Sequence, residues 1–541
     1  MGRITSETTT SGKTSPPASL DMDLFSARDL RQMSEMGIRP EEVSRQIELF
    51  RNPPPYTRVL RPCQPGDGIL AISVAEHAAL LEHFDAAARR GRIAKLVPAS
   101  GAATRMFKDL LAFLAEPEDT LSEPVQTFFD NLPRFAFYED LAAALGADGI
   151  DLEEAVRNGE HRLILSCLLE KPGLGYADLP KGLLPFHRYP EGPRTPFAEH
   201  LVEAAAIARD DDGLCLLHFT VSPEHQDGFE RLLDRVRPVL EERYDCRFEV
   251  TFSTQRHSTD TLAVDLRNQP FRQDDGTLLF RPGGHGSLID NLRELGREGW
   301  DVVLLKNVDN VVPDGRKPVV LLWKRLLGGC LLSVREQAFT HLDRLEALDG
   351  AVLKEKTGDE AETVLRQAAG FVEGELCRPL PEGFGETGSR ERKRFLMEVL
   401  DRPVRVCGVV RNQGEPGGGP FWVESPSGGI SPQIVETSQI DPRDPEQQAI
   451  LKASTHFNPV DIACGLRDRH GRPYDLNRAI DPATVFISEK SHEGRPLKAL
   501  ERPGLWNGAM AGWNTVFVEV PGATFAPVKT VFDLLRPEHQ G

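Results

Sequence analysis

The chain has no pattern of cysteines that predicts a metal centre. Its eight cysteines are scattered over 541 residues and none forms a C-x-x-C pair, so a zinc site is not expected. Several stand in apolar runs, such as Cys215 in LCLLHF and Cys407 in VRVCGVV. Scattered spacing and apolar surroundings are typical of buried thiols in a reducing compartment.

The chain also lacks an excess of positive charge. Lysine and arginine total 64 against 82 aspartates and glutamates, which gives a formal net charge of −18. A protein that coats nucleic acid needs a basic surface to neutralise phosphates, so no nucleic-acid partner is expected. A few focused cations can still hold a small phosphorylated ligand inside an acidic protein.

No apolar run is long enough to span a membrane. The most apolar stretch, residues 318–334, is interrupted by Lys324, Arg325 and two glycines, whereas a bilayer span needs roughly 20 mostly apolar residues. A buried helix or a pair of strands is expected there instead. The polar first 20 residues contain no apolar signal core. These absences predict a cytoplasmic protein without membrane contacts.

Short apolar runs alternate with amphipathic segments along the chain. A strand over 95–99 precedes a loop and a helix over 104–114, and a strand over 213–222 precedes another helix. Further strands are expected over 248–254, 277–282 and 301–310. Strands that alternate with helices predict an α/β fold with a largely parallel sheet.

The chain is expected to divide into four regions. They are a disordered tail over 1–20, an N-terminal helical extension over 21–91, a nucleotide-binding α/β core over 92–345 with a helical insertion at about 115–170, and a C-terminal region over 346–541. The extension is expected to hold a helix from Leu24 to about Phe50 and another over 74–91. The C-terminal region begins with charged helices and continues with a β-rich part.

Small residues occupy the loop between the first strand and its helix. The segment Pro98-Ala-Ser-Gly-Ala-Ala-Thr-Arg lets backbone N–H groups approach a phosphate, and the helix N-terminus that follows adds positive potential. Arg105 could clamp a phosphate through two hydrogen bonds. A plain strand-to-helix turn is the alternative interpretation of such a loop taken alone.

Two lysines and an aspartate stand at positions that suit a polyphosphate. Lys181 lies between a proline and a glycine, and Lys529 lies in the apolar segment TFAPVKTVF. Asp309 ends a strand, where open α/β sheets bind ligands, and its carboxylate suits Mg²⁺. The alternatives are solvated side chains for Lys181 and Asp309, and for Lys529 a lysine that extends over apolar surface.

Three glycines precede a further amphipathic helix. Gly283, Gly284 and Gly286 surround His285 and would let a flat base or ribose come close to the backbone. A flexible connector is the alternative. His285 is expected to support the loop, not to act as an acid or a base.

Taken in order, these segments resemble the UDP-sugar pyrophosphorylases, in particular the UDP-N-acetylglucosamine and UDP-glucose pyrophosphorylases. ASGAATRM resembles the family's G-x-G-T-R nucleotide loop, LPKGLLPF its P-K-G or P-K-S segment, and NVDN its aspartate motif. FAPVKTVFDLL resembles its late F-x-P-[VL]-K motif. The resemblance covers about Lys95 to Leu535 as ordered motifs, and it also admits a distantly related, uncharacterised bacterial family built on a domain of unknown function.

The resemblance implies a GT-A-like, Rossmann-type nucleotidyltransferase core with a mixed, mainly parallel sheet. It nominates Arg105, Lys181 and Lys529 as catalytic residues and Asp309 as the ligand of Mg²⁺. It assigns the nucleotide to Ala99, Ser100, Gly101, Ala102, Thr104, Gln255, Gly283, Gly284, His285 and Gly286, and the sugar to Asn310, Glu436 and Asn458. Asp461 stands where the family has a second Asn, so recognition of an N-acetyl group is not implied.

The activity implied by this resemblance joins a nucleoside triphosphate, with UTP the first choice, to a sugar 1-phosphate and releases pyrophosphate. One alternative is a glycosyltransferase that uses a nucleotide sugar, although Asp309 is followed by Asn310 and Val311 instead of completing a D-x-D pair. A second alternative is a nucleotide-sugar-binding protein without catalysis, because Ala102 and Ala103 stand where the family favours glycine. The sugar, the base and the oligomeric state stay open.

Overall fold

The computed structural model describes residues 24–116, 120–348, 359–414, 417–425, 428–458 and 461–540. The tail expected over 1–20 therefore lies outside the described residues. The chain divides into two compact units. One consists of Met1–Pro54, Arg256–Gly283 and Ile487–Glu501, and the other of Pro55–Gln255, Gly284–Phe486 and Arg502–Gly541.

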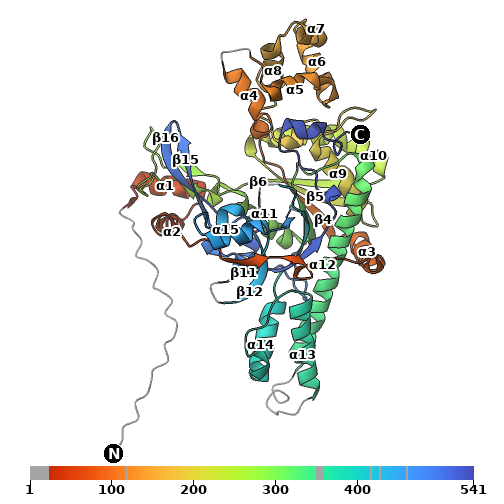
Figure 1. The fold of residues 1–541 in the computed structure, drawn as a ribbon, viewed down its shortest axis with the longest axis vertical. Helices are drawn as coiled ribbons and strands as arrows, with labels where there is room; N and C mark the ends of the chain where they lie inside the picture. Colours follow the sequence, from red (N-terminus) through yellow and green to blue (C-terminus); the bar gives the residue numbers. More distant parts are fainter. Residues whose placement is uncertain are drawn as a thin grey trace, which may run out of the picture. The chain divides into compact units, whose positions relative to one another are not determined.

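The larger unit is built on a ten-stranded sheet (Figure 1). Along the sheet the order is β2-β3-β17-β10-β14-β9-β4-β5-β6, and β13 pairs with β10 beside this path. The strands are β2 (Gln64–Pro65), β3 (Gly68–Leu70), β4 (Ile93–Pro98), β5 (Leu214–Val221), β6 (Arg247–Thr254), β9 (Val302–Lys306), β10 (Val404–Arg411), β13 (His456–Phe457), β14 (Asp461–Gly465) and β17 (Asn514–Glu519).

Most neighbouring strands of this sheet run parallel. β14 is antiparallel to both β10 and β9, and β13 is antiparallel to β10, whereas β9, β4, β5 and β6 are parallel to one another. The predicted α/β class with a mixed, mainly parallel sheet is confirmed. Strands of the β-rich C-terminal part, β10, β14 and β17, join the core sheet, which local sequence patterns did not indicate because strand pairing is set by distant contacts.

A second, three-stranded sheet belongs to the same unit. It consists of β1 (Val59–Pro62), β11 (Gly419–Glu424) and β12 (Ile430–Val435), all antiparallel. A strand from the beginning of the chain thus pairs with strands from its last third.

Helices cover both faces of the large sheet. Val302 and Leu304 of β9 join one hydrophobic cluster and Val303 and Leu305 join another, as expected for a strand buried on both sides. The first cluster includes side chains of α3 (Val74–Arg89), α9 (Pro196–Ile207), α10 (Gln226–Tyr244), α12 (Lys317–Glu346), α13 (Asp359–Gly374) and α14 (Ser389–Leu400). The second includes α11 (Leu288–Glu298), while α15 (Pro445–Lys452) packs beside β1.

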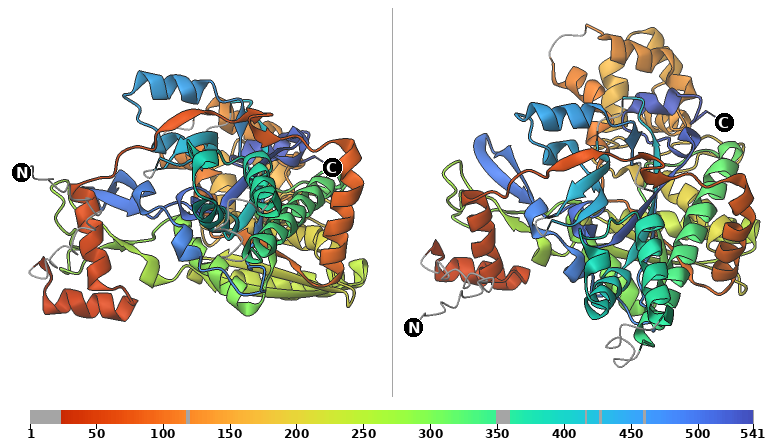
Figure 2. Two further views of the ribbon diagram at one scale, coloured as in Figure 1. Left: turned by 90° about the horizontal axis from the view of Figure 1, so that it is seen from below. Right: turned by 60° about the horizontal axis from the view of Figure 1, so that its bottom comes forward.

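The longest apolar run forms one helix, α12, which lies beside α3 (Figure 2). Two glycines permit this close packing. A Cβ added to Gly329 would stand 2.1 Å from the backbone oxygen of Leu80, and one added to Gly328 would stand 2.5 Å from the ring of Phe84. Among the described residues no helix is long and apolar enough to cross a membrane.

A cluster of short helices follows β4. It comprises α4 (Lys108–Ala115), α5 (Glu123–Asp130), α6 (Tyr138–Ala147), α7 (Leu152–Arg157) and α8 (His161–Leu169). The stacked rings of Phe128, Phe135 and Phe137 lie in its core. Val528 and Val531, on either side of Lys529, pack into the same core, so this cluster supports the segment that carries the lysine.

The smaller unit holds α1 (Ala27–Met36) and α2 (Pro40–Arg51), together with β7 (Thr261–Leu262), β8 (Phe280–Arg281), β16 (Arg495–Glu501) and all of β15 (Phe486–His492) except its first residue. The single helix expected from Leu24 to about Phe50 is wrong. Gly37 adopts a left-handed conformation, φ 69°, that ends α1, and Pro40 begins α2. The strand expected over 277–282 is reduced to β8.

All eight cysteines are free thiols, and six of them are buried. Burial raises the pKa of the Cys407 thiol to about 11. The six buried cysteines are therefore apolar core residues, as the sequence predicts.

Candidate active site

The small-residue loop after β4 is bonded to the segment that carries Lys181. The N–H of Ala103 donates to the carbonyl oxygen of Leu179 at 2.9 Å, and the N–H of Lys181 donates to that of Gly101 at 3.1 Å. The N–H of Ala99 donates to Thr220 at the end of β5 at 2.8 Å. The long helical stretch between the loop and Lys181 does not separate them in space.

Lys181 and Lys529 converge on Asp309. Asp309 follows β9, and its Oδ2 accepts from the Nζ of Lys181 at 2.8 Å and from the Nζ of Lys529 at 3.3 Å. The Nζ of Lys181 also donates to the carbonyl oxygen of Val528 at 2.6 Å. The N–H of Val528 in turn donates to the carbonyl oxygen of Asp309 at 3.1 Å. Three segments that are far apart in the sequence thus meet at one carboxylate.

The three charged side chains differ in exposure. The side chains of Asp309 and Lys181 are 10% and 12% exposed, whereas that of Lys529 is 61% exposed. Burial alone would raise the pKa of the Asp309 carboxyl, but the two ammonium groups outweigh burial and hold this pKa below its usual value. Asp309 is therefore a carboxylate at neutral pH, and Lys529 is the cation that solvent reaches.

Asp309 is suited to bind a divalent cation only together with other oxygen ligands. Among the described residues, no group of three or more His, Cys, Asp or Glu side chains could hold a metal ion. Both lysines contact Oδ2 of Asp309, and neither contacts its Oδ1. One carboxylate completed by substrate phosphates is a common donor set for Mg²⁺, so the residues fit this ion.

Arg105 and Thr104 lie at the end of the small-residue loop. Both are in the short 3₁₀ helix η2 (Ala103–Arg105), and both are exposed, as are Ser100, Gly101 and Ala102. The Thr104 hydroxyl donates to the carbonyl oxygen of Ala177 at 3.0 Å. Of the alanines in this loop, Ala102 is exposed beside Lys181, whereas Ala99 and Ala103 are buried.

A second group of predicted residues meets around His285. The His285 ring stacks on Trp506 with centroids 4.0 Å apart, and its Nδ1 accepts from the N–H of Leu505 at 3.0 Å. The Nε2, which therefore carries the proton in the neutral ring, lies 3.6 Å from Oε1 of Glu436. The structure thus brings together one residue assigned to the nucleotide and one assigned to the sugar.

The other predicted binding residues come from further segments of the chain. Asn458 lies near Glu436, since its N–H donates to the carbonyl oxygen of Gly418 at 3.3 Å and an added Cβ at Gly418 would lie 3.5 Å from the Cα of Glu436. Asn458 is 4% exposed, and neither polar atom of its side chain has a hydrogen-bond partner among the described residues. Gln255 directly follows β6, and its buried Nε2 is likewise unpartnered there. The Oδ1 of Asn310 accepts from the N–H of Ala526 at 3.0 Å, which fastens the Asp309 loop to the Lys529 segment. Gly284 and Gly286 belong to the larger unit and Gly283 to the smaller.

Helix α9 contributes charged residues that the sequence analysis missed. Glu199, His200 and Glu203 are 0% exposed, although helix PFAEHLVEAAAI resembles an ordinary apolar helix with solvated charges. The Nε2 of His200 lies 3.3 Å from the carbonyl oxygen of Val308, the residue before Asp309. The sequence signal for this burial is that apolar residues surround the charged residues on every side of the helix.

Glu203 is the centre of one buried network beneath the sheet. Its carboxylate accepts from Lys95 of β4 and from Lys306 of β9, both at 2.9 Å. Lys324 of α12 is paired with Asp461 of β14 at 2.7 Å. Asp461 occupies the position where the UDP-sugar pyrophosphorylase motif that this sequence resembles has a second Asn. Its carboxylate is therefore paired with a lysine within the protein.

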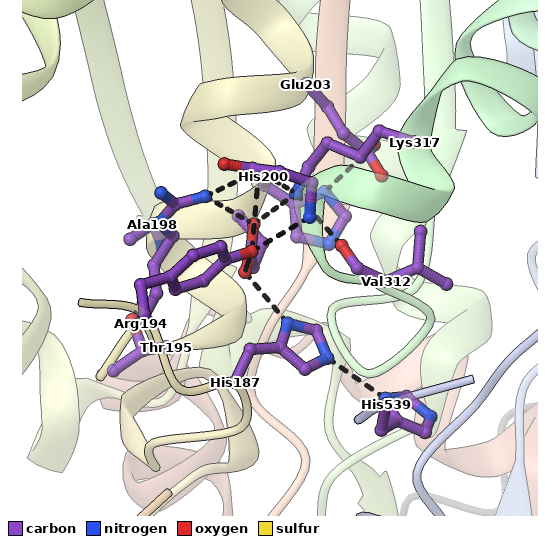
Figure 3. A network of polar contacts seen from close by, with 12 residues as sticks. His187, Arg194, Thr195, Ala198, His200, Glu203, Val312, Lys317 and His539 are labelled. Carbon is purple, nitrogen blue, oxygen red and sulfur yellow. Dashed lines mark hydrogen bonds and ion pairs between the residues drawn. The ribbon is translucent and has the colours of Figure 1, made fainter. Parts of the chain in front are cut away.

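Glu199 is the centre of a second buried network (Figure 3). It accepts hydrogen bonds from His187, Tyr189, Arg194 and Lys317. Burial alone would raise the pKa of the Glu199 carboxyl, but His187, Lys317 and Arg194 outweigh burial and lower it.

The chain is similar to several solved structures. One is a UDP-glucose pyrophosphorylase variant from Leishmania major in complex with UDP-glucose, at 12% identity and a TM-score of 0.44, over 94% of this chain and 77% of that one. Another is the uridine diphosphate N-acetylglucosamine pyrophosphorylase from Trypanosoma brucei in complex with an inhibitor, at 13% identity and a TM-score of 0.46, over 94% and 79%. Both are members of the group that the sequence motifs resemble.

Comparison by sequence gives a family without an assigned activity. No curated protein matches this chain. The model of the domain of unknown function DUF4301 matches residues 26–540, which is nearly the whole chain. The chain therefore belongs to the DUF4301 family.

Proposed function

We propose that this protein is a nucleotidyltransferase that joins a nucleoside triphosphate to a sugar 1-phosphate and releases pyrophosphate. The observation that supports this function most directly is the meeting of Lys181, Asp309 and Lys529 beside the small-residue loop. Two cations and a carboxylate at the carboxyl end of a strand are suited to hold a polyphosphate and a divalent cation.

The proposed reaction requires no catalytic base. An oxygen of the sugar phosphate attacks the α-phosphorus in line, a P–O bond forms, and the bond from the α-phosphorus to the bridging oxygen breaks. The electron pair leaves with pyrophosphate. Since the attacking phosphate is already anionic, positioning and charge neutralisation supply most of the rate enhancement.

Each charged residue has a separate task in this reaction. Lys181 and Arg105 hold the triphosphate, and Lys529 neutralises charge on the α-phosphate or the sugar phosphate. Asp309 would hold Mg²⁺, which supplies positive charge at the phosphate oxygens. The phosphates in turn accept hydrogen bonds from the lysines that contact Asp309, so its carboxylate becomes available to the ion.

The other predicted residues are proposed to bind the two substrates. Gln255 and the loop at His285 would contact the base and ribose, and Glu436 and Asn458 would orient sugar hydroxyls. The unpartnered amide of Asn458 supports a polar ligand, because a buried amide without partners costs free energy.

The test is a direct assay of pyrophosphate release. The full-length protein with Mg²⁺ is incubated with each nucleoside triphosphate, UTP first, and with a panel of sugar 1-phosphates. We expect pyrophosphate from at least one pair, and a nucleotide sugar in equal amount. A nucleotide sugar that binds but yields no nucleoside triphosphate with added pyrophosphate would instead indicate a binding protein. Transfer of its sugar to an acceptor would indicate a glycosyltransferase.

A further inference from the structure

The loop that carries Asp309 and the C-terminal segment that carries Lys529 are both anchored to α9. The contacts described above hold the two charged side chains at the site itself. Behind the site, a separate set of buried polar contacts reaches each segment from Glu199. This carboxylate lies outside the proposed reaction, and its burial at 0% exposure demands compensating partners.

One set of contacts reaches the loop after Asp309. The ammonium group of Lys317 donates to Oε2 of Glu199, to Oδ1 of Asp314 at 2.8 Å and to the carbonyl oxygen of Val312 at 2.9 Å. All three donor positions of this ammonium are therefore used. Lys317 thus binds the loop at Val312, three residues after Asp309. His200 contacts the loop at Val308, one residue before Asp309.

Another set of contacts reaches the end of the chain. The Nδ1 of His187 faces Oε1 of Glu199 at 2.8 Å, so it carries a proton and donates. The Nε2 of His187 lies 3.0 Å from the Nδ1 of His539, and the two rings stack at 19° with centroids 5.3 Å apart (Figure 3). His539 therefore ties the last residues of the chain to Glu199 through His187.

The C-terminal segment between Lys529 and His539 is itself well fixed. Asp533 accepts from the backbone N–H groups of Lys529 and Thr530, both at 2.7 Å, and the N–H of His539 donates to Arg536 at 3.0 Å. A displacement of His539 is therefore transmitted along a short, hydrogen-bonded piece of chain.

We propose that Glu199 is a positioning residue that sets the Asp309 loop against the Lys529 segment through two arms, one formed by Lys317 and the other by His187 and His539. The inference deepens the proposed function, on which its catalytic meaning rests. Its structural content is independent of any substrate: the carboxylate is the common anchor of two segments that are distant in sequence.

The experiment measures backbone hydrogen exchange by mass spectrometry in the full-length protein. For Glu199→Gln we expect faster exchange both in peptides over 307–314 and in peptides over 526–535, by about tenfold to a hundredfold, because a hydrogen bond to a charged group is lost. Peptides over β5 should exchange as in the unaltered protein. Unchanged exchange in either segment overturns the inference.

Two variants separate the arms. Lys317→Gln should speed hydrogen exchange in the 307–314 peptides alone. His539→Phe retains a ring that can stack on His187, and it should speed exchange in the 526–535 peptides alone. His470→Phe, at an exposed histidine, is the matched control and should change neither. If Glu199→Gln does not fold, the two arm variants test the inference instead. An arm variant that speeds hydrogen exchange in both segments, or in neither, overturns it.

Kinetics connect the anchor to the proposed reaction. Glu199→Gln should lower kcat at least about tenfold and raise the Mg²⁺ concentration for half-maximal activity, since Asp309 and Lys529 are misplaced. A mere loss of folded protein lowers kcat without moving the Mg²⁺ dependence, and that result would contradict the inference. If exchange responds as expected while the unaltered protein releases no pyrophosphate, the anchor stands and the proposed function fails.

Discussion

At the scale of single residues, one carboxylate organises the site. Asp309 lies between two lysines that would otherwise repel each other, and its single negative charge offsets part of that repulsion and leaves one net positive charge at the cluster. Lys181 is held on two sides by Asp309 and Val528, whereas Lys529 is mostly exposed. For the proposed reaction, this difference supports giving Lys181 the positioning of the substrate and Lys529 the charge that develops.

Lys529→Ala should lower kcat about a hundredfold to a thousandfold, which corresponds to about 2.7–4 kcal/mol of lost transition-state stabilisation, by analogy with the removal of an oxyanion donor. The KM for the nucleotide should change much less. Initial rates of pyrophosphate release measure both. Lys452→Ala, at an exposed lysine in the last turn of α15, is the control and should behave as the unaltered protein. Equal kcat values for the two variants would refute this role of Lys529.

Asp309→Asn tests the metal assignment. The amide retains the shape but not the charge of the ligand, so Mn²⁺ used as a probe should bind the nucleotide-loaded protein at least about tenfold more weakly. Titration calorimetry measures this affinity, and pyrophosphate release should require correspondingly more Mg²⁺. A chelator should stop release by the unaltered protein until Mg²⁺ is restored. Unchanged Mn²⁺ affinity would remove Asp309 from the metal site.

The charged residues that meet at Asp309 were singled out from the sequence, but the buried residues that support them were not. Lys181, Asp309 and Lys529 stand in recognisable segments, and the structure brings them together. Glu199 and Glu203 were missed because a charged side chain on a short helix is normally exposed, and only the packing of distant strands shows that these are buried.

At the scale of elements, the contact between α12 and α3 depends on residues without side chains. Gly328 and Gly329 let the two helices approach so closely that a methyl group would overlap α3. Glycine lowers helix stability in isolation, so its presence in the middle of α12 is explained by this contact.

Gly329→Ala should therefore lower the free energy of unfolding by about 1–3 kcal/mol, because the added Cβ meets the backbone of Leu80. Gly370→Ala in α13 is the matched control, since no atom lies within 4 Å of its added Cβ. That substitution should stabilise the protein by about 0.4–1 kcal/mol. Thermal unfolding of the two variants compares them, and a stable Gly329→Ala protein would show that the helices can separate.

Elements formed by local sequence could be predicted, and their partners could not. Strands β4, β5, β6 and β9 and helix α3 agree with the expected segments because apolar spacing is a local property. The break after Gly37 was missed, although Gly37 and Pro40 are residue types that end and begin helices. The pairing of β14 between β10 and β9 depends on contacts between distant segments, which no local pattern records.

At the scale of the whole molecule, buried neutral histidines make stability depend on pH. Burial lowers the pKa of His218 from 6.5 to about 4. The unfolded chain therefore takes up the proton first as pH falls, and the folded state loses stability between pH 6.5 and about 4 at about 1.4 kcal/mol per pH unit.

His218→Gln should reduce this dependence. Between about pH 7 and about pH 5 the unaltered protein should lose about 2 kcal/mol more unfolding free energy than the variant, because only it carries this titrating ring. Urea unfolding at the two pH values measures the difference. His470→Gln, at an exposed position, should leave the pH dependence unchanged, and an equal effect of both substitutions would show that burial of His218 is not the cause.

The place of β17 in the sheet bears on the order in which the sheet can form during synthesis. β17 comes near the end of the chain, yet it lies inside the sheet and joins β3, from near the beginning, to β10. β3 and β10 cannot be joined in this way until the ribosome has synthesised the chain through β17, whereas the sheet of β1, β11 and β12 can form earlier. Lys529 emerges only ten residues after this strand. A chain that stops before β17 therefore lacks the strand that joins β3 to β10, and it also lacks Lys529.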